Sequence, residues 1–295
     1  MSNPLRLIIV SGLSGSGKSV ALHVLEDLDY YCIDNLPAAL LMAAIEDVRT
    51  GDEPIGMLAV GVDARTRTED LRALPEVLRS LADQNVQAEL IFLHASDAIL
   101  KQRYSESRRR HPLASAETQL QVAINNEREI LAEIQNGADL IIDTSHSSIY
   151  ELADVIRNRV DRRKTDDLSV LIQSFGFKFG IPADADFVFD LRSLPNPYWT
   201  IALRGLNGRD PEVVDFLNSK DAFIDMFDDI LHFLRRWIPQ YQRAKRSYLT
   251  VAIGCTGGQH RSVCMTEKLV AALSETHEPV LVRHNSLTGH RLDPE

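Results

Sequence analysis

Short apolar runs alternate with segments of helical periodicity through the first half of the chain. The runs are short enough to be strands of a sheet that is buried on both faces. They are Leu5–Val10, Tyr30–Asp34, Met57–Asp63, Glu89–Leu93 and Ala138–Asp143. The helical segments are Ser19–Glu26, Ala38–Val48, Asp97–Ser107, Glu117–Gln135 and Ser148–Val160. Strands that alternate with helices predict βαβ units, and hence a parallel sheet with helices on both faces.

A charged run without periodicity, Asp161–Asp167, interrupts this pattern. Beyond it the chain again mixes predicted strands and predicted helices. The strands are Val170–Ile172, Asp186–Asp190, Ser247–Gly254 and Pro279–Arg283, and the helices are Pro211–Asn218, Ala222–Ile238 and His260–Ser274. We therefore expect two α/β domains, residues 1–162 and 163–295, which suits a chain of 295 residues.

The turn after the first predicted strand contains a complete phosphate-binding motif, GxxxxGKS (Walker A). Its residues are Gly12, Leu13, Ser14, Gly15, Ser16, Gly17, Lys18 and Ser19. A preceding strand and a following helix are the context in which this motif binds phosphate. The backbone N–H groups would surround a triphosphate, Lys18 would reach its β- and γ-phosphates, and the Ser19 hydroxyl would coordinate Mg²⁺. The motif predicts that the chain binds a nucleoside triphosphate with Mg²⁺.

Other polar residues could belong to the same nucleotide site. Asp63 ends a predicted strand, where a carboxylate can bind Mg²⁺, although an aspartate there can equally cap a turn. Asp34 has the same position on another strand and could face a second substrate or form a turn. Arg108, Arg109 and Arg110 follow a predicted helix and favour a lid that neutralises phosphate charge, with a solvated helix end as the alternative.

The second predicted domain contains Cys-x5-Arg-Ser between a strand and a helix. The residues of interest are Cys255, Thr256, Gly257, Gly258, His260, Arg261 and Ser262. This is the layout of a cysteine-phosphatase loop, in which N–H groups and an arginine surround a phosphate and the helix N-terminus stabilises a thiolate. Two interpretations stay open: Cys255 is a nucleophile, or the loop holds a phosphorylated metabolite without cleaving it.

Composition narrows the choice of partners. A net charge of −10 argues against a broadly basic surface that coats nucleic acid. The three cysteines are an odd number and lack metal-ligand spacing, which favours a reduced, cytoplasmic chain. No apolar run approaches the roughly 20 residues that a membrane helix needs. We therefore expect a cytoplasmic protein with no membrane partner.

Taken together, the motifs resemble those of the RapZ/YvcJ family of bacterial P-loop nucleotide-binding proteins, also called RNase adapter proteins. The segments that carry the resemblance are Gly12–Ser19, Tyr31–Pro37, Asp63–Arg65, Arg108–Leu113, Ser174–Gly180, Asp190–Pro197 and Gly254–Ser262. They span nearly the full length of the chain. The resemblance implies a kinase-like N-terminal domain that binds ATP and GTP and hydrolyses them slowly. It also implies a C-terminal domain, similar to a phosphofructokinase subdomain, that senses an amino-sugar phosphate such as glucosamine 6-phosphate.

The resemblance also implies roles for individual residues. ATP would bind at Gly12–Ser19, and a second, GTP-binding element would comprise Asp63, Ala64, Arg65 and Thr66. Cys255, Thr256, Gly257 and Arg261 would hold the sugar phosphate. The candidate catalytic residues for hydrolysis are then Lys18, Ser19 and Asp63, of which Ser19 and Asp63 would bind Mg²⁺.

The family further implies a homo-oligomer that binds a small regulatory RNA and presents it to an endoribonuclease. The C-terminal tail of this chain departs from the RNA-binding branch because Arg283 and Arg291 are balanced by Asp293 and Glu295. A neutral tail removes much of the electrostatic affinity for RNA. The residues leave three other functions open: a small-molecule kinase, a phosphatase at Cys255, and an RNA-binding adapter.

Overall fold

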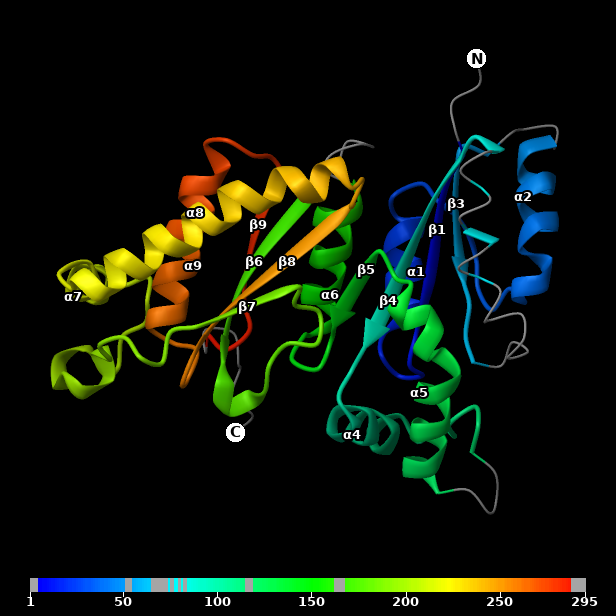
Figure 1. Cartoon of the computed structure of the whole chain (residues 1–295). Helices are drawn as coiled ribbons and strands as arrows, with labels where there is room; N and C mark the ends of the chain where they lie inside the picture. The colour runs from blue at the N-terminus through cyan, green and yellow to red at the C-terminus, as the bar shows by residue number, and fades with distance from the viewer. Residues whose placement is uncertain are drawn as a thin grey trace. The chain divides into compact units, whose positions relative to one another are not determined.

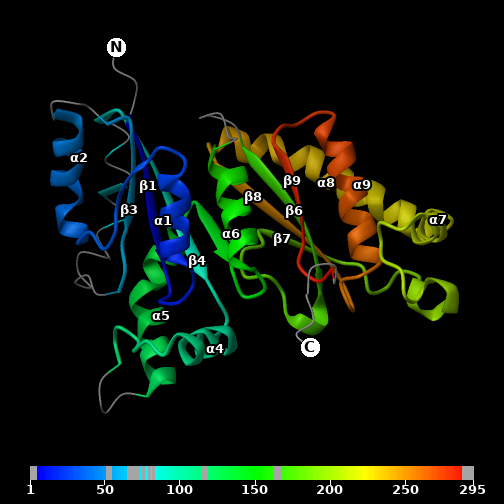
Figure 2. The same cartoon turned by 180° about the vertical axis from the view of Figure 1, so that it is seen from behind.

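The structure is a computed structural model of the chain, and it describes residues 5–50, 55–64, 74, 77–78, 81, 84–114, 119–161 and 168–287. The chain divides into two compact units, Met1–Asp161 and Arg162–Glu295. Figure 1 and the opposite view in Figure 2 show both units. Each unit contains a parallel sheet flanked by helices, so the expected α/β class is confirmed.

The sheet of the first unit has the strand order β2-β3-β1-β4-β5 within the described residues. The strands are β1 (Leu5–Gly12), β2 (Tyr31–Ile33), β3 (Met57–Gly61), β4 (Val86–His94) and β5 (Leu140–Asp143). Every neighbouring pair is parallel. Strand β1 lies between β3 and β4 and is almost wholly buried, which explains its unbroken apolar sequence. The loop that follows β1 therefore leaves the sheet at its centre.

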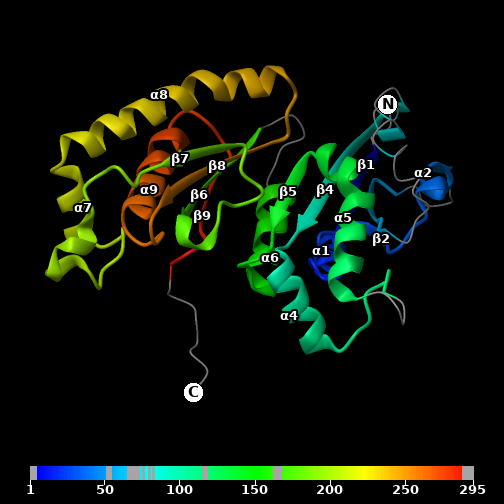
Figure 3. The ribbon, with the colours of Figure 1, turned by 60° about the horizontal axis from the view of Figure 1, so that its bottom comes forward.

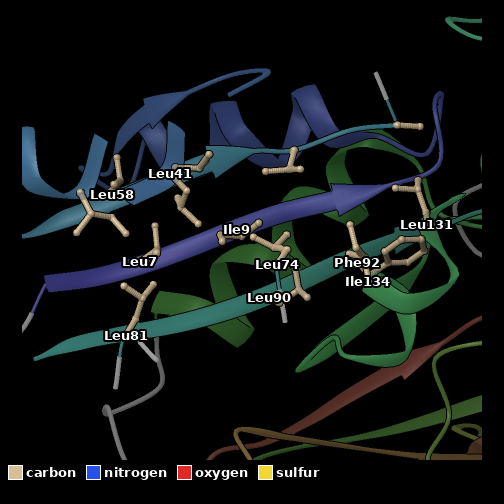
Figure 4. Packing of buried hydrophobic residues seen from close by; sticks show 14 of the residues in the cluster. Leu7, Ile9, Leu41, Leu58, Leu74, Leu81, Leu90, Phe92, Leu131 and Ile134 are labelled. Atoms are coloured by element: carbon tan, nitrogen blue, oxygen red, sulfur yellow. The ribbon is translucent and has the colours of Figure 1, made fainter. Parts of the chain in front are cut away.

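Helices cover both faces of this sheet. Their bounds are α1 (Lys18–Glu26), α2 (Leu41–Thr50), α4 (Asp97–Ser107), α5 (Leu120–Asn136) and α6 (Ile149–Ile156), the last followed by a π-helical turn, Arg157–Asp161. On one face, Leu41 of α2 and Leu131 of α5 share an apolar core with Leu7 and Ile9 of β1, as Figure 4 shows. Successive strand residues point to opposite faces. Helix α1 packs against β1, β2 and β3 on the other face, beside α6.

Gly12 ends β1 in a conformation that other residues rarely adopt, with φ of 144°. A Cβ atom at this position would lie 2.3 Å from the carbonyl oxygen of Leu93 in β4. We expect Gly12→Ala to lower the free energy of unfolding of the first unit by about 2 kcal/mol or more, because backbone strain and a steric clash add together. Urea unfolding of the full chain measures this change. Gly56→Ala is the matched control, because no atom lies within 4 Å of its Cβ position, and an equal loss in both variants would contradict the explanation.

The second unit is built on a smaller parallel sheet with the order β7-β8-β6-β9 within the described residues. The strands are β6 (Ser169–Gly176), β7 (Phe187–Asp190), β8 (Tyr248–Cys255) and β9 (Val280–His284). Short 3-10 turns at Phe177–Phe179, Pro197–Trp199 and Ile201–Leu203 lie in the connections. Because the strands are parallel, their carboxyl ends meet at one edge of the sheet. Cys255 is the last residue of β8, so the loop that follows it lies at that edge.

The helices of the second unit are α7 (Pro211–Asn218), α8 (Asp221–Arg243) and α9 (Arg261–Ser274). Their buried side chains form one apolar core with alternate residues of β6 and β8, so all three helices pack on the same face. Figure 3 shows α8 and α9 alongside these strands. Helix α8 passes through Pro239 and extends beyond its predicted end, and Tyr241 still packs against the core. Among the described residues, we found no helix with the length and apolarity needed to cross a membrane.

Candidate functional site

The Walker A segment forms a tight loop between β1 and α1. The Ser16 N–H donates to the Leu13 carbonyl oxygen at 3.0 Å, and α1 begins directly at Lys18. The Lys18 ammonium group folds back and donates to the Gly12 carbonyl oxygen at 2.6 Å. Helix α1 thus begins at the loop, and the N-terminus of a helix favours an anion through its N–H groups and its dipole.

A cavity of about 760 Å³ lies at this loop. The sequence-predicted residues that line it are Ser14, Gly15, Gly17, Lys18, Ser19, Asp34, Asp63, Arg109 and Arg110. The structure thus brings together the phosphate loop, two aspartates that follow neighbouring strands, and two of the three arginines. Asn35, Arg103 and Tyr104 contribute further polar groups to the same cavity.

Other predicted residues do not line the cavity. Gly12, Leu13, Ser16 and Ala64 are buried beside it. Arg108 has a left-handed backbone conformation at the C-terminus of α4 and is exposed to solvent. Its N–H donates to the Tyr104 carbonyl oxygen and so ends the helix. Arg65 and Thr66 lie outside the described residues.

The oxygen atoms at the cavity are suited to Mg²⁺. The Ser19 hydroxyl and the Asp63 carboxylate both line it, and Mg²⁺ prefers oxygen ligands. In nucleotide sites this ion keeps water and phosphate oxygens in its shell, so few protein ligands are needed. Among the described residues, no group of three or more His, Cys, Asp or Glu side chains is placed to hold a metal ion.

Glu127 of α5 is a site residue that sequence reasoning missed. Its side chain is buried and accepts three hydrogen bonds: from the Ser14 N–H at 2.8 Å, from the Ser14 hydroxyl at 2.5 Å, and from Nε2 of His111 at 3.1 Å. Both hydrogen-bond donors of Ser14, its N–H and its hydroxyl, are therefore held by a protein carboxylate. The available signal was the position of Glu127 between Ile124 and Leu131, in the apolar stripe of its helix.

The hydrogen bonds determine the ionisation of Glu127. Burial raises the pKa of a carboxyl group, but here the bonds from His111 and Ser14 and the nearby Lys18 charge outweigh it and hold the pKa of Glu127 below its ordinary value. Nδ1 of His111 accepts from the Leu113 N–H at 3.1 Å. The ring proton therefore lies on Nε2 and faces an ionised Glu127.

A second set of bonds holds the carbonyl groups of the phosphate loop. The Arg103 guanidinium of α4 donates to the Gly15 carbonyl oxygen at 3.0 Å and to the Thr144 carbonyl oxygen at 2.7 Å. The Thr144 hydroxyl, beyond the end of β5, donates to the Ser16 carbonyl oxygen at 2.9 Å. The loop is thus fixed from two sides before any ligand binds, which lowers the entropy cost of binding.

In the second unit, Cys255 is enclosed by its own loop. Its side chain is buried, its Sγ accepts the Gly258 N–H at 3.3 Å, and the Ser262 hydroxyl lies 3.2 Å from the same sulfur. Gly258 has φ of 70°, and a Cβ there would lie 2.6 Å from the Gly176 nitrogen. The Cys255 sulfur is therefore directed into the loop.

Arg261 and His260 are bound by neighbouring turns of the same unit. The Arg261 guanidinium donates to the carbonyl oxygens of Leu191, Arg192 and Leu194 at 3.3, 3.1 and 2.8 Å. It also donates to the Thr256 hydroxyl at 3.3 Å. These contacts engage both terminal nitrogens of the guanidinium, whereas its Nε is buried without a hydrogen-bond partner in the described part of the chain.

His260 is also buried and also contacts a backbone carbonyl oxygen of a neighbouring turn. Its Nε2 lies 3.2 Å from the Leu203 carbonyl oxygen, and burial holds the pKa of His260 below its ordinary value. A neutral ring that donates to this carbonyl therefore anchors the Ile201–Leu203 turn. On the solvent side of the Cys255 loop, Thr256 is exposed and Gly257 is half-buried. These two residues, with the half-buried Gln259, are the accessible part of the loop.

Family comparisons cover both units. The RapZ-like N-terminal domain matches residues 5–164, and the RapZ C-terminal domain matches residues 168–288. A nucleotide-binding protein of Hahella chejuensis is 49% identical over 284 residues, covering 96% of this chain and 99% of the relative. One from Halorhodospira halophila is 51% identical over 285 residues, with the same coverage. The chain belongs to the RapZ family.

Two solved structures resemble about half of the chain. A shikimate kinase from Bacteroides thetaiotaomicron matches 52% of this chain and 94% of its own, with 14% identity and a TM-score of 0.35. The YorR protein from Bacillus subtilis, in complex with phosphorylated GDP, matches 52% of this chain and 95% of its own, with 20% identity and a TM-score of 0.36.

Proposed function

We propose that this chain is a Mg²⁺-dependent nucleotide-binding regulatory protein that hydrolyses ATP and GTP slowly and senses an amino-sugar phosphate. The observation that supports it most is the single cavity that the phosphate loop shares with Asp63, Arg109 and Arg110. Nucleotide binding is assigned to residues 1–162 and metabolite sensing to residues 163–295. The relatives named nucleotide-binding proteins support the first assignment.

The proposed roles at the cavity follow from charge and position. Lys18 leaves the Gly12 carbonyl oxygen and contacts the β- and γ-phosphates, while Ser19 and Asp63 hold Mg²⁺ directly or through water. Arg109 and Arg110 neutralise the charge that develops as the terminal phosphate is cleaved. Asp63, which begins the expected GTP-binding element, lines the same cavity as the phosphate loop. We therefore assign ATP and GTP to one site, where the contacts to phosphates are the same for both nucleotides.

The proposed sugar-phosphate site is the exposed side of the Cys255 loop. The Thr256 hydroxyl and the Gly257 N–H are the accessible donors there, and the N-terminus of α9 follows. The buried Arg261 guanidinium donates a hydrogen bond to the Thr256 hydroxyl and so holds this residue in place. The ligand would be held by the loop and not cleaved, since Cys255 is buried and its sulfur is directed into the loop.

We expect Thr256→Val to weaken binding of glucosamine 6-phosphate by the full chain about fivefold to tenfold, because one hydrogen bond to a charged phosphate is lost. Calorimetric titration measures the dissociation constant. Thr276→Val, at the far end of α9, is the matched control and should bind as the wild type does. If the wild type binds the ligand saturably and Thr256→Val binds it with the same dissociation constant, the ligand does not bind at this loop.

A small-molecule kinase is the second candidate, favoured by one observation. Asp34 and Asn35 line the cavity of the phosphate loop, although they play no part in holding nucleotide phosphates in the scheme above. A carboxylate at that place could orient the hydroxyl group of an acceptor. The two candidates differ in one assay: a phosphate acceptor accelerates ADP release from a kinase and leaves a hydrolase unchanged.

The proposal includes the partners that the family resemblance implies: a small regulatory RNA, an endoribonuclease and further copies of this chain in the cytoplasm. Helix α8 offers basic residues interleaved with an aromatic, Arg235, Arg236 and Trp237, of which Trp237 is 41% exposed. Such a pattern suits phosphate contacts and base stacking.

A further inference from the structure

The contacts of Glu127 link two parts of the nucleotide site that are far apart in the sequence. One end of the contact is Ser14 in the phosphate loop, and the other is His111, directly after the arginine segment Arg108–Arg110. The side chains of Glu127 and His111 are fully buried at their contact. A buried carboxylate, far from solvent, depends on its donors for stability.

His111 is fixed on three sides. Its Nε2 donates to Glu127, its Nδ1 accepts the Leu113 N–H, and its ring packs against Tyr104 with centroids 5.3 Å apart. Tyr104 also borders the phosphate loop, because a Cβ on Gly15 would lie 3.5 Å from its ring. The segment that carries Arg109 and Arg110 is therefore anchored at its downstream end to the interior beneath the phosphate loop.

We propose that Glu127 is a positioning residue that holds the phosphate loop and the arginine segment in one fixed arrangement for the nucleotide. The inference rests on the proposed nucleotide binding and deepens it. Arg109 and Arg110 do not swing in on a free lid. Their segment is anchored through His111, and only their exposed side chains adjust to the phosphates.

The charge of Glu127 explains why the link is firm. An ionised carboxylate that is buried needs both Ser14 and His111, and withdrawal of either donor leaves part of its charge uncompensated. Movement of the arginine segment away from the cavity would break the His111 contact. The contact therefore favours the arrangement in which Arg109 and Arg110 line the cavity.

The test is the affinity of the full chain for ATP with Mg²⁺, measured by calorimetry in a set of variants. His111→Ala should weaken binding about tenfold, because the arginine segment loses its anchor. His111→Gln should recover most of the affinity, since its amide can donate to Glu127. Glu127→Gln lacks the charge and places an NH₂ group, itself a donor, against a donor of Ser14 or His111, so it should weaken binding in the same direction.

A double-mutant comparison separates positioning from mere support of the fold. In the background Arg109→Ala with Arg110→Ala, His111→Ala should weaken binding much less than in the wild type, because there is no arginine left to position. Arg108→Ala, outside the cavity, is the control background in which the full effect should persist. Urea unfolding of each variant shows that the measured affinities belong to folded protein.

Three results would overturn the inference. The first is an equal effect of His111→Ala in the Arg108→Ala background and in the background that lacks Arg109 and Arg110. The second is His111→Gln binding as poorly as His111→Ala, and the third is a wild-type affinity in His111→Ala. If the wild type itself binds no ATP, the proposed nucleotide function fails instead. If the wild type binds ATP and His111→Ala binds it equally well, only the positioning role fails.

Discussion

Replacing Lys18 by alanine is expected to reduce ATP hydrolysis by about 100-fold or more, which is the cost of removing one charged group that stabilises the transition state. Lys18 begins α1 and lines the cavity of the phosphate loop. Without its ammonium group, the charge of the β- and γ-phosphates is met only by Mg²⁺ and the arginines. Phosphate release from ATP by the full chain measures the effect.

Lys101→Ala is the matched control for this prediction. Lys101 is an exposed lysine of α4 in the same unit and does not line the cavity. Its removal changes the net charge equally but should leave hydrolysis unchanged. Hydrolysis that survives Lys18→Ala would point to a contaminating enzyme or to a site elsewhere in the chain.

A second large effect is expected from Arg261→Ala, on stability. The guanidinium holds three backbone carbonyl oxygens of the segment 191–194 and the Thr256 hydroxyl. Removing a buried donor leaves these acceptors unsatisfied and creates a cavity, so the second unit should lose about 3 kcal/mol or more of its unfolding free energy. Urea unfolding of the full chain, followed by the fluorescence of Trp199 and Trp237, reports on this unit.

Arg192→Ala is the comparison for that prediction. Arg192 forms an ion pair with Asp190 at 2.7 Å, but about half of its side chain is exposed. Exposed ion pairs contribute little, so this variant should lose much less unfolding free energy than Arg261→Ala does. Similar losses in the two variants would mean that burial and the carbonyl contacts are not what makes Arg261 important.

Because Arg261 holds three backbone carbonyl oxygens, its replacement affects the structure of the second unit as well as any ligand. A loss of sugar-phosphate binding in Arg261→Ala could follow from unfolding of the segment 191–194 alone. Thr256→Val alters the exposed side of the loop and leaves the three carbonyl contacts of Arg261 in place. It is therefore the sharper probe of the proposed metabolite site.

Much of the fold could be predicted because the sheets are parallel and buried. Strand β1 is almost wholly buried, so its apolar residues follow one another and predict the strand clearly. Helices α4 and α7 begin and end where the sequence indicates. The end of α8 could not be predicted in this way. Pro239 normally disfavours continuation of a helix, and the packing of Tyr241 on the core outweighs that local preference.

The candidate site was predictable where a contiguous motif, or the end of a predicted strand or helix, marks the residue. The phosphate loop is contiguous, so its pattern could be read directly from Gly12–Ser19. Glu127 lies 113 residues from its partner Ser14, and no local pattern connects the two. His260 and Arg261 show the converse case. They fit a ligand-binding motif in the sequence, and in the structure they hold turns that are distant along the chain.

Titration of the wild-type full chain with ATP, in the presence and absence of Mg²⁺, tests the nucleotide assignment most directly. The account predicts saturable binding of one nucleotide per chain that weakens when Mg²⁺ is removed, because the phosphates then lose the ion held by Ser19 and Asp63. No saturable binding of ATP or GTP by folded protein would contradict it.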